Sequence, residues 1–154
     1  MSPKNSKSNN DDQEHSPYPV ITMTLKEYFQ NIEGTGILST ADSAGSVNAA
    51  VYSKPHVLDD RTVAFVMRQR LTHHNLQSNP FAAYLFLENT PGHRGLRLHL
   101  KKLKEETDPA VIEPFRMRQL SPEEERKKGP VYLVLFTVVK VLPLTGSGEA
   151  KAGS

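Results

Sequence analysis

The chain has 154 residues, a formal net charge of +2 at pH 7 and no cysteine; this length suits one domain, and the missing cysteines exclude disulfides, cysteine metal sites and a cysteine nucleophile. The small net charge gives no bulk electrostatic argument for nucleic-acid binding. No run approaches the roughly 18 apolar residues of a membrane span, and the N-terminus lacks the apolar segment of a secretory signal, so we expect a soluble, cytoplasmic protein.

Both ends of the chain are polar. Residues 1–19 consist mainly of Ser, Asn, Lys, Asp and Pro, and residues 145–154 have the sequence TGSGEAKAGS. Such segments bury too little apolar surface to offset the entropy lost on ordering. We therefore expect a disordered tail at 1–19, one folded domain at 20–144 and a flexible tail at 145–154.

A short helix opens the predicted domain. Thr24 and Glu27 have the spacing of a capping box, and Gly34 marks the expected end of the helix. The apolar residues between them fall on one helical face, namely Leu25, Tyr28, Phe29 and Ile32. We expect this helix to cover the core of the domain.

We expect residues 36–88 to form the central part of the fold. It holds four strand-like runs, at 37–41, 46–52, 61–68 and 81–87. The first two are joined by the sequence DSAG, which places Asp at the first and Gly at the fourth position of a turn. A helix of about two turns is predicted at 71–77. The order of these elements predicts a mainly β fold, a small β-barrel with peripheral α-helices.

The remaining chain adds two strands and two short helices. Residues 96–101 alternate strictly between apolar and polar side chains, which predicts a strand with one basic face. Helices should start at Asp108 and at Ser121, because each is an N-cap residue followed by proline, and Pro114 should shorten or kink the first of them. The run 130–142 is long and rich in β-branched and aromatic residues, which predicts a strand buried on both faces.

The strand at 130–142 has two apolar faces. Strict alternation places one row of side chains together, namely Val131, Leu133, Leu135, Val139 and Val141. The other row is Tyr132, Val134, Phe136, Val138 and Leu142. A small barrel covers only one face with its own interior, the short helices can cover part of the other, and a large exposed apolar patch is unusual for a monomer. We therefore expect a homodimer in which the second face meets the partner subunit.

A candidate anion site lies where a strand ending in basic residues leads into the predicted helix at 71–77. A helix N-terminus can hold a phosphate, and Arg68 and Arg70 offer charge-assisted hydrogen bonds. Thr72 adds a hydroxyl, and Asn75 lies one turn further on the same side. The alternative is a solvated strand end followed by a threonine N-cap.

Several short motifs resemble one protein family. They are, in order, Gly36-x-Leu38-x-Thr40-x-Asp42-x-x-Gly45, Asn48-Ala49-Ala50 and Thr72-x-x-Asn75-Leu76-x-x-Asn79-Pro80. Their order and spacing resemble the split-barrel flavin-binding proteins related to pyridoxamine 5′-phosphate oxidase. The resemblance implies the FMN-binding split-barrel fold, FMN as cofactor and flavin-dependent oxidoreductase chemistry on an unknown substrate with an unknown electron donor. It also implies a dimer with the cofactor between the subunits.

The resemblance assigns roles to particular residues. It implies that backbone of the second strand lines the flavin ring, at Asn48, Ala49, Ala50 and Val51, with Val66 and Met67 near it. The small side chains at 49 and 50 would let a flat ligand approach the backbone, although small residues also suit a crowded barrel. The phosphate would be held by Arg68, Arg70, Thr72 and Asn75. Members often carry a basic residue immediately before the threonine; here it is Leu71, so the preceding arginines would supply the charge.

Two other functions stay open. One is a non-catalytic carrier of flavin or haem on the same barrel. The other is a nucleic-acid-binding barrel that uses the basic residues of 94–104. The low net charge and the lack of interleaved aromatic residues count against the second, and we expect 94–104 to form a solvated outer face.

His73 and His74 do not predict a metal site. Neighbouring residues on a helix point about 100° apart, and the i, i+4 spacing of helical metal ligands is missing. We expect exposed or partly packed histidines and no bound metal. No residue stands out as a catalytic acid, base or nucleophile.

Overall fold

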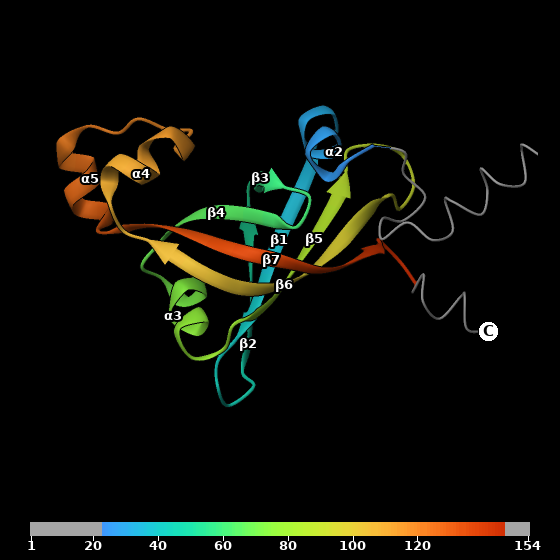
Figure 1. Ribbon diagram of the computed structural model, residues 1–154, viewed down its shortest axis with the longest axis horizontal. Helices are drawn as coiled ribbons and strands as arrows, with labels where there is room; N and C mark the ends of the chain where they lie inside the picture. Colours follow the sequence, from blue (N-terminus) through green and yellow to red (C-terminus); the bar gives the residue numbers. More distant parts are fainter. Residues whose placement is uncertain (1–22, 147–154) are drawn as a thin grey trace, which may run out of the picture.

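The computed structural model describes residues 23–146, so the predicted tails lie outside it apart from 145 and 146. Seven antiparallel strands form one sheet in the order β2-β1-β5-β6-β7-β4-β3 (Figure 1). They are β1 (Gly34–Ala41), β2 (Val47–Tyr52), β3 (His56–Asp59), β4 (Thr62–Arg68), β5 (Phe81–Glu88), β6 (Gly95–Glu106) and β7 (Val131–Pro143). The helices are α2 (Leu25–Asn31), α3 (Leu71–Ser78), α4 (Pro109–Ile112), the 3-10 helix η1 (Glu113–Phe115) and α5 (Pro122–Lys128).

The sheet curves around one main core. Strands from across the whole sheet contribute buried side chains to it, among them Leu38, Phe65, Tyr84, Leu98 and Phe136. The rings of Phe65 and Tyr84 lie 5.1 Å apart, which joins β4 to β5 across the interior. This arrangement confirms the predicted mainly β barrel with peripheral helices.

Helix α2 covers the end of the barrel near β3 (Figure 1). Its capping box is present, because Thr24 Oγ1 accepts from the N–H of Glu27 at 3.2 Å and the Glu27 carboxylate accepts from the N–H of Thr24. Tyr28 and Phe29 are buried in the core. The Tyr28 hydroxyl donates to Glu88 Oε2 at 2.5 Å and so ties the helix to β5. The predicted role of this helix is confirmed.

The β1–β2 hairpin also follows its sequence. Asp42 accepts the N–H of Gly45 at its carbonyl and the N–H of Ala44 at its side chain, and Gly45 has a φ of 87° that favours glycine. Strand β1 begins at Gly34, earlier than predicted. A Cβ on Gly36 would stand 1.8 Å from the Tyr84 hydroxyl, so the core tyrosine packs directly over that backbone.

Two strand assignments from the sequence are wrong. Strand β3 was not predicted, because it has only four residues, ends within the Asp59-Asp60 pair that indicates a turn, and shows no alternation of burial. Strand β6 runs to Glu106 instead of ending at 101. Its charged second half pairs with β7 through a register shift between Lys102 and Lys104, which breaks the alternation that sequence analysis relies on.

A bulge in β7 changes which side chains face the core. Val139 has no partner on β6, and Val138 and Val141 on either side of it both join the main core. The predicted grouping of Val141 with Leu133 and Leu135 is therefore wrong, because one extra residue reverses the alternation of a strand.

The outer face of β4 and β7 has a small core of its own. Ala64, Leu133 and Leu135 are buried there beneath Ile112 of α4, and Phe115 of η1 packs beside them. Helix α4 ends just before Pro114, as predicted. The expectation that this face of β7 meets a second subunit is wrong, because the same chain covers it.

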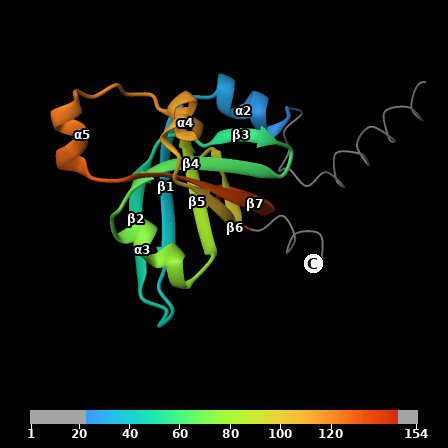
Figure 2. The same ribbon diagram turned by 60° about the vertical axis from the view of Figure 1, so that its left-hand side comes forward.

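Helix α5 stands at one end of the molecule, beyond α4 (Figures 1 and 2). It starts with a capping box between Ser121 and Glu124 and ends at Gly129, whose φ is 78°. None of its residues is fully buried. Its attachment to the barrel therefore depends on polar contacts. No helix in the part of the chain that the structure describes is long and apolar enough to cross a membrane.

Candidate functional site

The corner between β4 and α3 has the geometry of an anion site. Arg70 is the N-cap residue of α3, and no side chain caps the helix. Thr72 lies two positions further on, so the alternative of a threonine N-cap is wrong. The N–H groups of the first turn thus point out of the helix beside an exposed arginine, and such a helix terminus favours negative charge.

Strand β2 reaches this corner through Tyr52. Burial raises the pKa of the Tyr52 hydroxyl, although its hydrogen bond with Thr72 and the charge of Arg70 both lower it. The Tyr52 ring packs edge-on against Phe65 at 5.9 Å. The fold therefore brings together the end of β2, the start of α3 and one of the predicted arginines.

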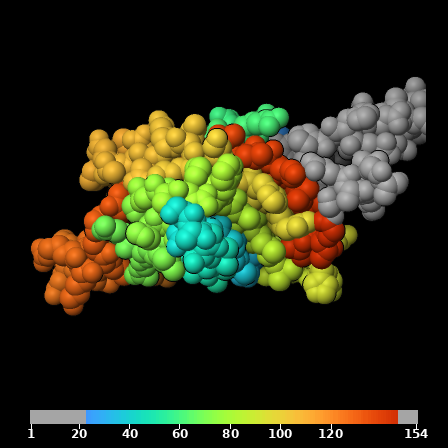
Figure 3. Space-filling view, turned by 90° about the horizontal axis from the view of Figure 1, so that it is seen from below, coloured from blue at the N-terminus to red at the C-terminus, as the bar shows by residue number. Residues whose placement is uncertain are grey.

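Thr72 and Asn75 of α3 face inward. Thr72 and Asn75 are 3% and 2% exposed, and Asn75 Nδ2 donates to Thr40 Oγ1 of β1 at 3.1 Å. Asn79 Nδ2 reaches the Asp42 carbonyl at 3.4 Å, which sets α3 beside the β1–β2 hairpin (Figure 3). These side chains hold the helix on the sheet, so an anion at this corner would meet the backbone of the first turn.

The two predicted arginines, Arg68 and Arg70, make different contacts. Arg70 is exposed near Tyr52. Arg68 turns toward α5: its Nη1 donates to the Gly129 carbonyl at 2.8 Å, and its guanidinium lies 3.5 Å from the Glu125 carboxylate. Arg70 is the arginine left open at the start of α3.

The predicted ring-binding residues lie in three places. Strand β2 is at the edge of the sheet and pairs only with β1. Its outer backbone edge, from Asn48 to Val51, is therefore free to donate and accept hydrogen bonds within the described structure. Val66 packs on the outer core beneath α4, whereas Met67 points into the main core and is 2% exposed.

A buried polar cluster was missed by sequence analysis. His73 Nε2 lies 3.1 Å from Glu105 Oε2, and the His73 ring stacks on Tyr132 at 3.9 Å. Burial alone would raise the pKa of Glu105, but hydrogen bonds from Lys102, Gln77 and His73 lower it to about 2. The members come from α3, β6 and β7, so no local motif could reveal them. His73 is fully buried rather than exposed or partly packed, and within residues 23–146 no group of three potential ligands could hold a metal.

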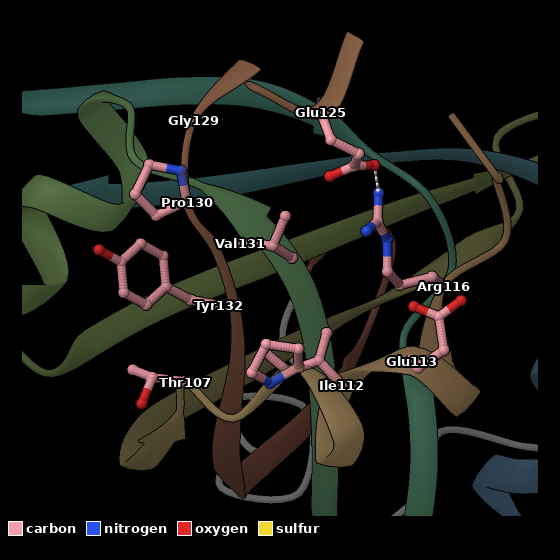
Figure 4. A pocket seen from close by; sticks show the side chains of 10 residues that line it. Thr107, Ile112, Glu113, Arg116, Glu125, Gly129, Pro130, Val131 and Tyr132 are labelled. Carbon is pink, nitrogen blue, oxygen red and sulfur yellow. Dashed lines mark hydrogen bonds and ion pairs between the residues drawn. The ribbon is translucent and has the colours of Figure 1, made fainter. Parts of the chain in front are cut away.

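A cavity of about 350 Å³ lies between the start of β7 and the helical segment of α4 and α5 (Figure 4). Its lining consists of Thr107, Pro109, Ile112, Glu113, Arg116, Glu125, Gly129, Pro130, Val131 and Tyr132. None of the predicted cofactor residues lines it. The cavity nevertheless lies next to the segment 68–75, because two of its lining residues contact that segment: Tyr132 stacks on His73, and Glu125 pairs with Arg68. Glu125 and Arg116 form an ion pair at its wall.

Two of the five arginines and lysines of 94–104 form ion pairs. Lys102 lies 2.7 Å from Glu105, and Lys104 lies 3.2 Å from Glu106. The Arg97 guanidinium donates to the Pro143 carbonyl at 2.9 Å. The two ion pairs reduce the positive charge of this surface and so weaken the case for nucleic-acid binding.

Comparison with known proteins identifies solved structures with a similar fold. No family model and no curated protein sequence matches the chain. An FMN-binding protein from Syntrophomonas wolfei superposes with a TM-score of 0.68 at 18% identity, over 95% of this chain and 98% of that chain. HupZ of Group A Streptococcus gives 0.60 at 18% identity, over 83% and 97% of the two chains.

A third solved structure points the same way. It is a Clostridium acetobutylicum protein related to general stress protein 26, described as of the pyridoxinephosphate oxidase family. It gives a TM-score of 0.56 at 13% identity, over 77% of this chain and 87% of that one. Likeness at these identities concerns the fold. The resemblance found in the sequence is confirmed at that level: the chain has the split-barrel fold of FMN-binding and pyridoxamine 5′-phosphate oxidase-like proteins.

Proposed function

We propose that the chain binds FMN at the corner of β2, β4 and α3 and takes part in flavin-dependent oxidation and reduction. The observation that carries the proposal is the uncapped first turn of α3 with Arg70 exposed beside it, in a fold shared with proteins described as FMN-binding. The backbone N–H groups of this turn and the Arg70 guanidinium fit a phosphate dianion. Thr72 would contribute its backbone N–H, because its side chain is buried against the sheet.

The flavin ring fits the free edge of β2. Its pyrimidine side needs both donors and acceptors, which the backbone of Asn48 to Val51 offers along that edge. Ala49 and Ala50 have small side chains that leave the backbone accessible. Bound FMN would supply the electron chemistry, while the chain would hold the ring and limit its contact with water.

We further propose a homodimer whose interface is the outer face of β2, β1 and β5. The strand register places mostly apolar side chains there, interrupted by Thr35 and Ser39; the apolar ones include Val47, Ala49, Val51, Ile37, Leu85, Phe81 and Leu87. Val47, Val51 and Phe81 are 83%, 76% and 58% exposed. A contiguous apolar face of this kind is unusual on a monomer, and a twofold-related copy would cover it with the same face. The ring site on β2 would then lie next to the interface.

The visible absorbance spectrum of the purified protein tests the cofactor. We expect flavin bands, or their appearance when FMN is added to flavin-free protein, with one FMN per subunit and weaker binding of riboflavin. A haem band, or no binding of either flavin, would refute the proposal. Bleaching of bound FMN by NADH or NADPH would support an enzyme, whereas bound flavin that no donor reduces would support a carrier.

A further inference from the structure

Glu125 holds two arginines from different parts of the chain. Its carboxylate forms an ion pair with Arg116 and lies 3.5 Å from the guanidinium of Arg68 on β4. All three side chains are partly buried, at 17% exposure for each arginine and 28% for the glutamate. The hydrogen bond from Arg116 and the nearby Arg68 keep the pKa of Glu125 below its usual range. Two guanidinium groups thus converge on one carboxylate position.

This position lies at the wall of the cavity of about 350 Å³ (Figure 4). Ile112, Pro130, Val131 and Tyr132 give the cavity an apolar side. The polar side holds Arg116 and Glu125, with Glu113 near Arg116. An apolar chamber with a few converging polar groups is the usual form of a small-molecule site.

The carboxylate at this position belongs to a helix that can release it. Helix α5 has no fully buried residue, and Glu123 and Glu124 beside Glu125 are exposed. Partly exposed ion pairs contribute little net stability. Rotation of Glu125 into water would therefore cost little if another anion took its place.

We propose that this cavity binds a small carboxylate with an apolar body, whose carboxylate replaces that of Glu125 between Arg68 and Arg116. The body packs against Ile112, Val131 and Tyr132. Glu113 and Glu125 together balance the charges of the two arginines, so the ligand exchanges with Glu125 and does not add to it. Binding is thereby coupled to release of the Glu125 carboxylate from the two arginines. The proposal does not rest on flavin binding, since neither Arg70 nor the β2 backbone from Asn48 to Val51, which we propose to hold FMN, lines the cavity.

The test uses 4-fluorobenzoate and its neutral counterpart 4-fluorobenzamide, titrated into the full-length protein and followed by ¹⁹F NMR. The wild type should bind the benzoate more tightly than the benzamide. Glu125→Gln removes the competing carboxylate and should strengthen benzoate binding about three- to tenfold without changing benzamide binding. Glu123→Gln makes the same charge change on the exposed side of α5 and should alter benzoate binding less than about twofold.

Arg116→Gln should weaken benzoate binding about tenfold or more, the effect of losing a charge-assisted hydrogen bond. Arg116→Lys keeps the charge and should retain part of the affinity, which separates loss of binding from loss of fold. Equal binding of the acid and the amide, or equal effects of Glu125→Gln and Glu123→Gln, would overturn the proposal. Flavin content is measured on the same samples, so failure here is distinct from failure of the flavin proposal.

Discussion

Asn75 Nδ2 donates a 3.1 Å hydrogen bond to the hydroxyl of Thr40, and both side chains are almost completely buried. This contact joins α3 to β1 from the inside. Two residues of the sequence motifs that resemble flavoproteins are therefore partners of each other. Their first role is to fix the helix whose N-terminus forms the proposed phosphate site.

Asn75→Ala should lower the free energy of unfolding by about 1–3 kcal/mol, because it leaves the buried Thr40 hydroxyl without its partner. Urea denaturation of flavin-free protein measures this. The double variant Asn75→Leu with Thr40→Val removes both polar partners and should cost less than the sum of the two single changes. Additive costs would mean that the two side chains act independently.

Arg70→Gln should weaken FMN binding about tenfold or more, the effect of losing a charge-assisted hydrogen bond to the phosphate. Riboflavin lacks the phosphate, so its affinity should stay unchanged. Quenching of flavin fluorescence gives both values. The exposed Arg94, changed to Gln, is the matched control and should leave both affinities as they are. If Arg70→Gln reduced FMN and riboflavin binding alike, Arg70 would not contact the phosphate.

Glu105 should make stability depend on pH. Its pKa is about 2 in the folded protein against a usual 4.5, so the folded state holds its charged form more strongly than the unfolded state does. Its stabilisation is complete above about pH 4.5 and is lost as the pH falls through about 2. Glu105→Gln should therefore be less stable than wild type at pH 7, and the gap should close toward pH 2. Urea titrations at pH 7, 4 and 2.5 would show this, and a constant gap would contradict it.

Local sequence patterns predicted much of the fold. The capping box at Thr24, the turn at Asp42 and the helix break at Pro114 each depend on residues within four positions, and all three are confirmed. The burial of β7 could also be predicted, because its run of β-branched and aromatic residues indicates a buried strand. The order of the sequence motifs also indicated the split barrel.

Contacts between distant segments could not be predicted. Arg68 meets Glu125 over a separation of 57 residues, and His73 meets Glu105 over 32. Neither glutamate has a local signal that separates it from its exposed neighbours. The bulge at Val139 was equally hidden, since alternation in a sequence assumes an unbroken strand. The packing of Ile112 and Phe115 on the outer face of β7 is also a contact between distant segments, so the sequence does not show that this face is covered.

Val51→Glu should convert the proposed homodimer into a monomer. Val51 is 76% exposed on the edge strand β2, within the apolar face that we propose as the interface. A carboxylate there would be buried without a partner on dimerisation, which costs several kcal/mol, yet it would remain solvated in a monomer. Sedimentation velocity at micromolar concentration measures the change.

Val139→Glu is the matched control for this prediction. Val139 is also an exposed valine, at 54%, but it lies in the β7 bulge and is separated from the face by β6. It should leave the dimer intact. Under conditions in which all three proteins are monomeric, both variants should keep the melting temperature of the wild type. Because the proposed ring site lies on β2 next to the interface, the Val51→Glu monomer should also bind FMN more weakly. A wild-type protein that stays monomeric at all concentrations would refute the interface, and a folded Val51→Glu monomer with full FMN affinity would place the cofactor within one subunit.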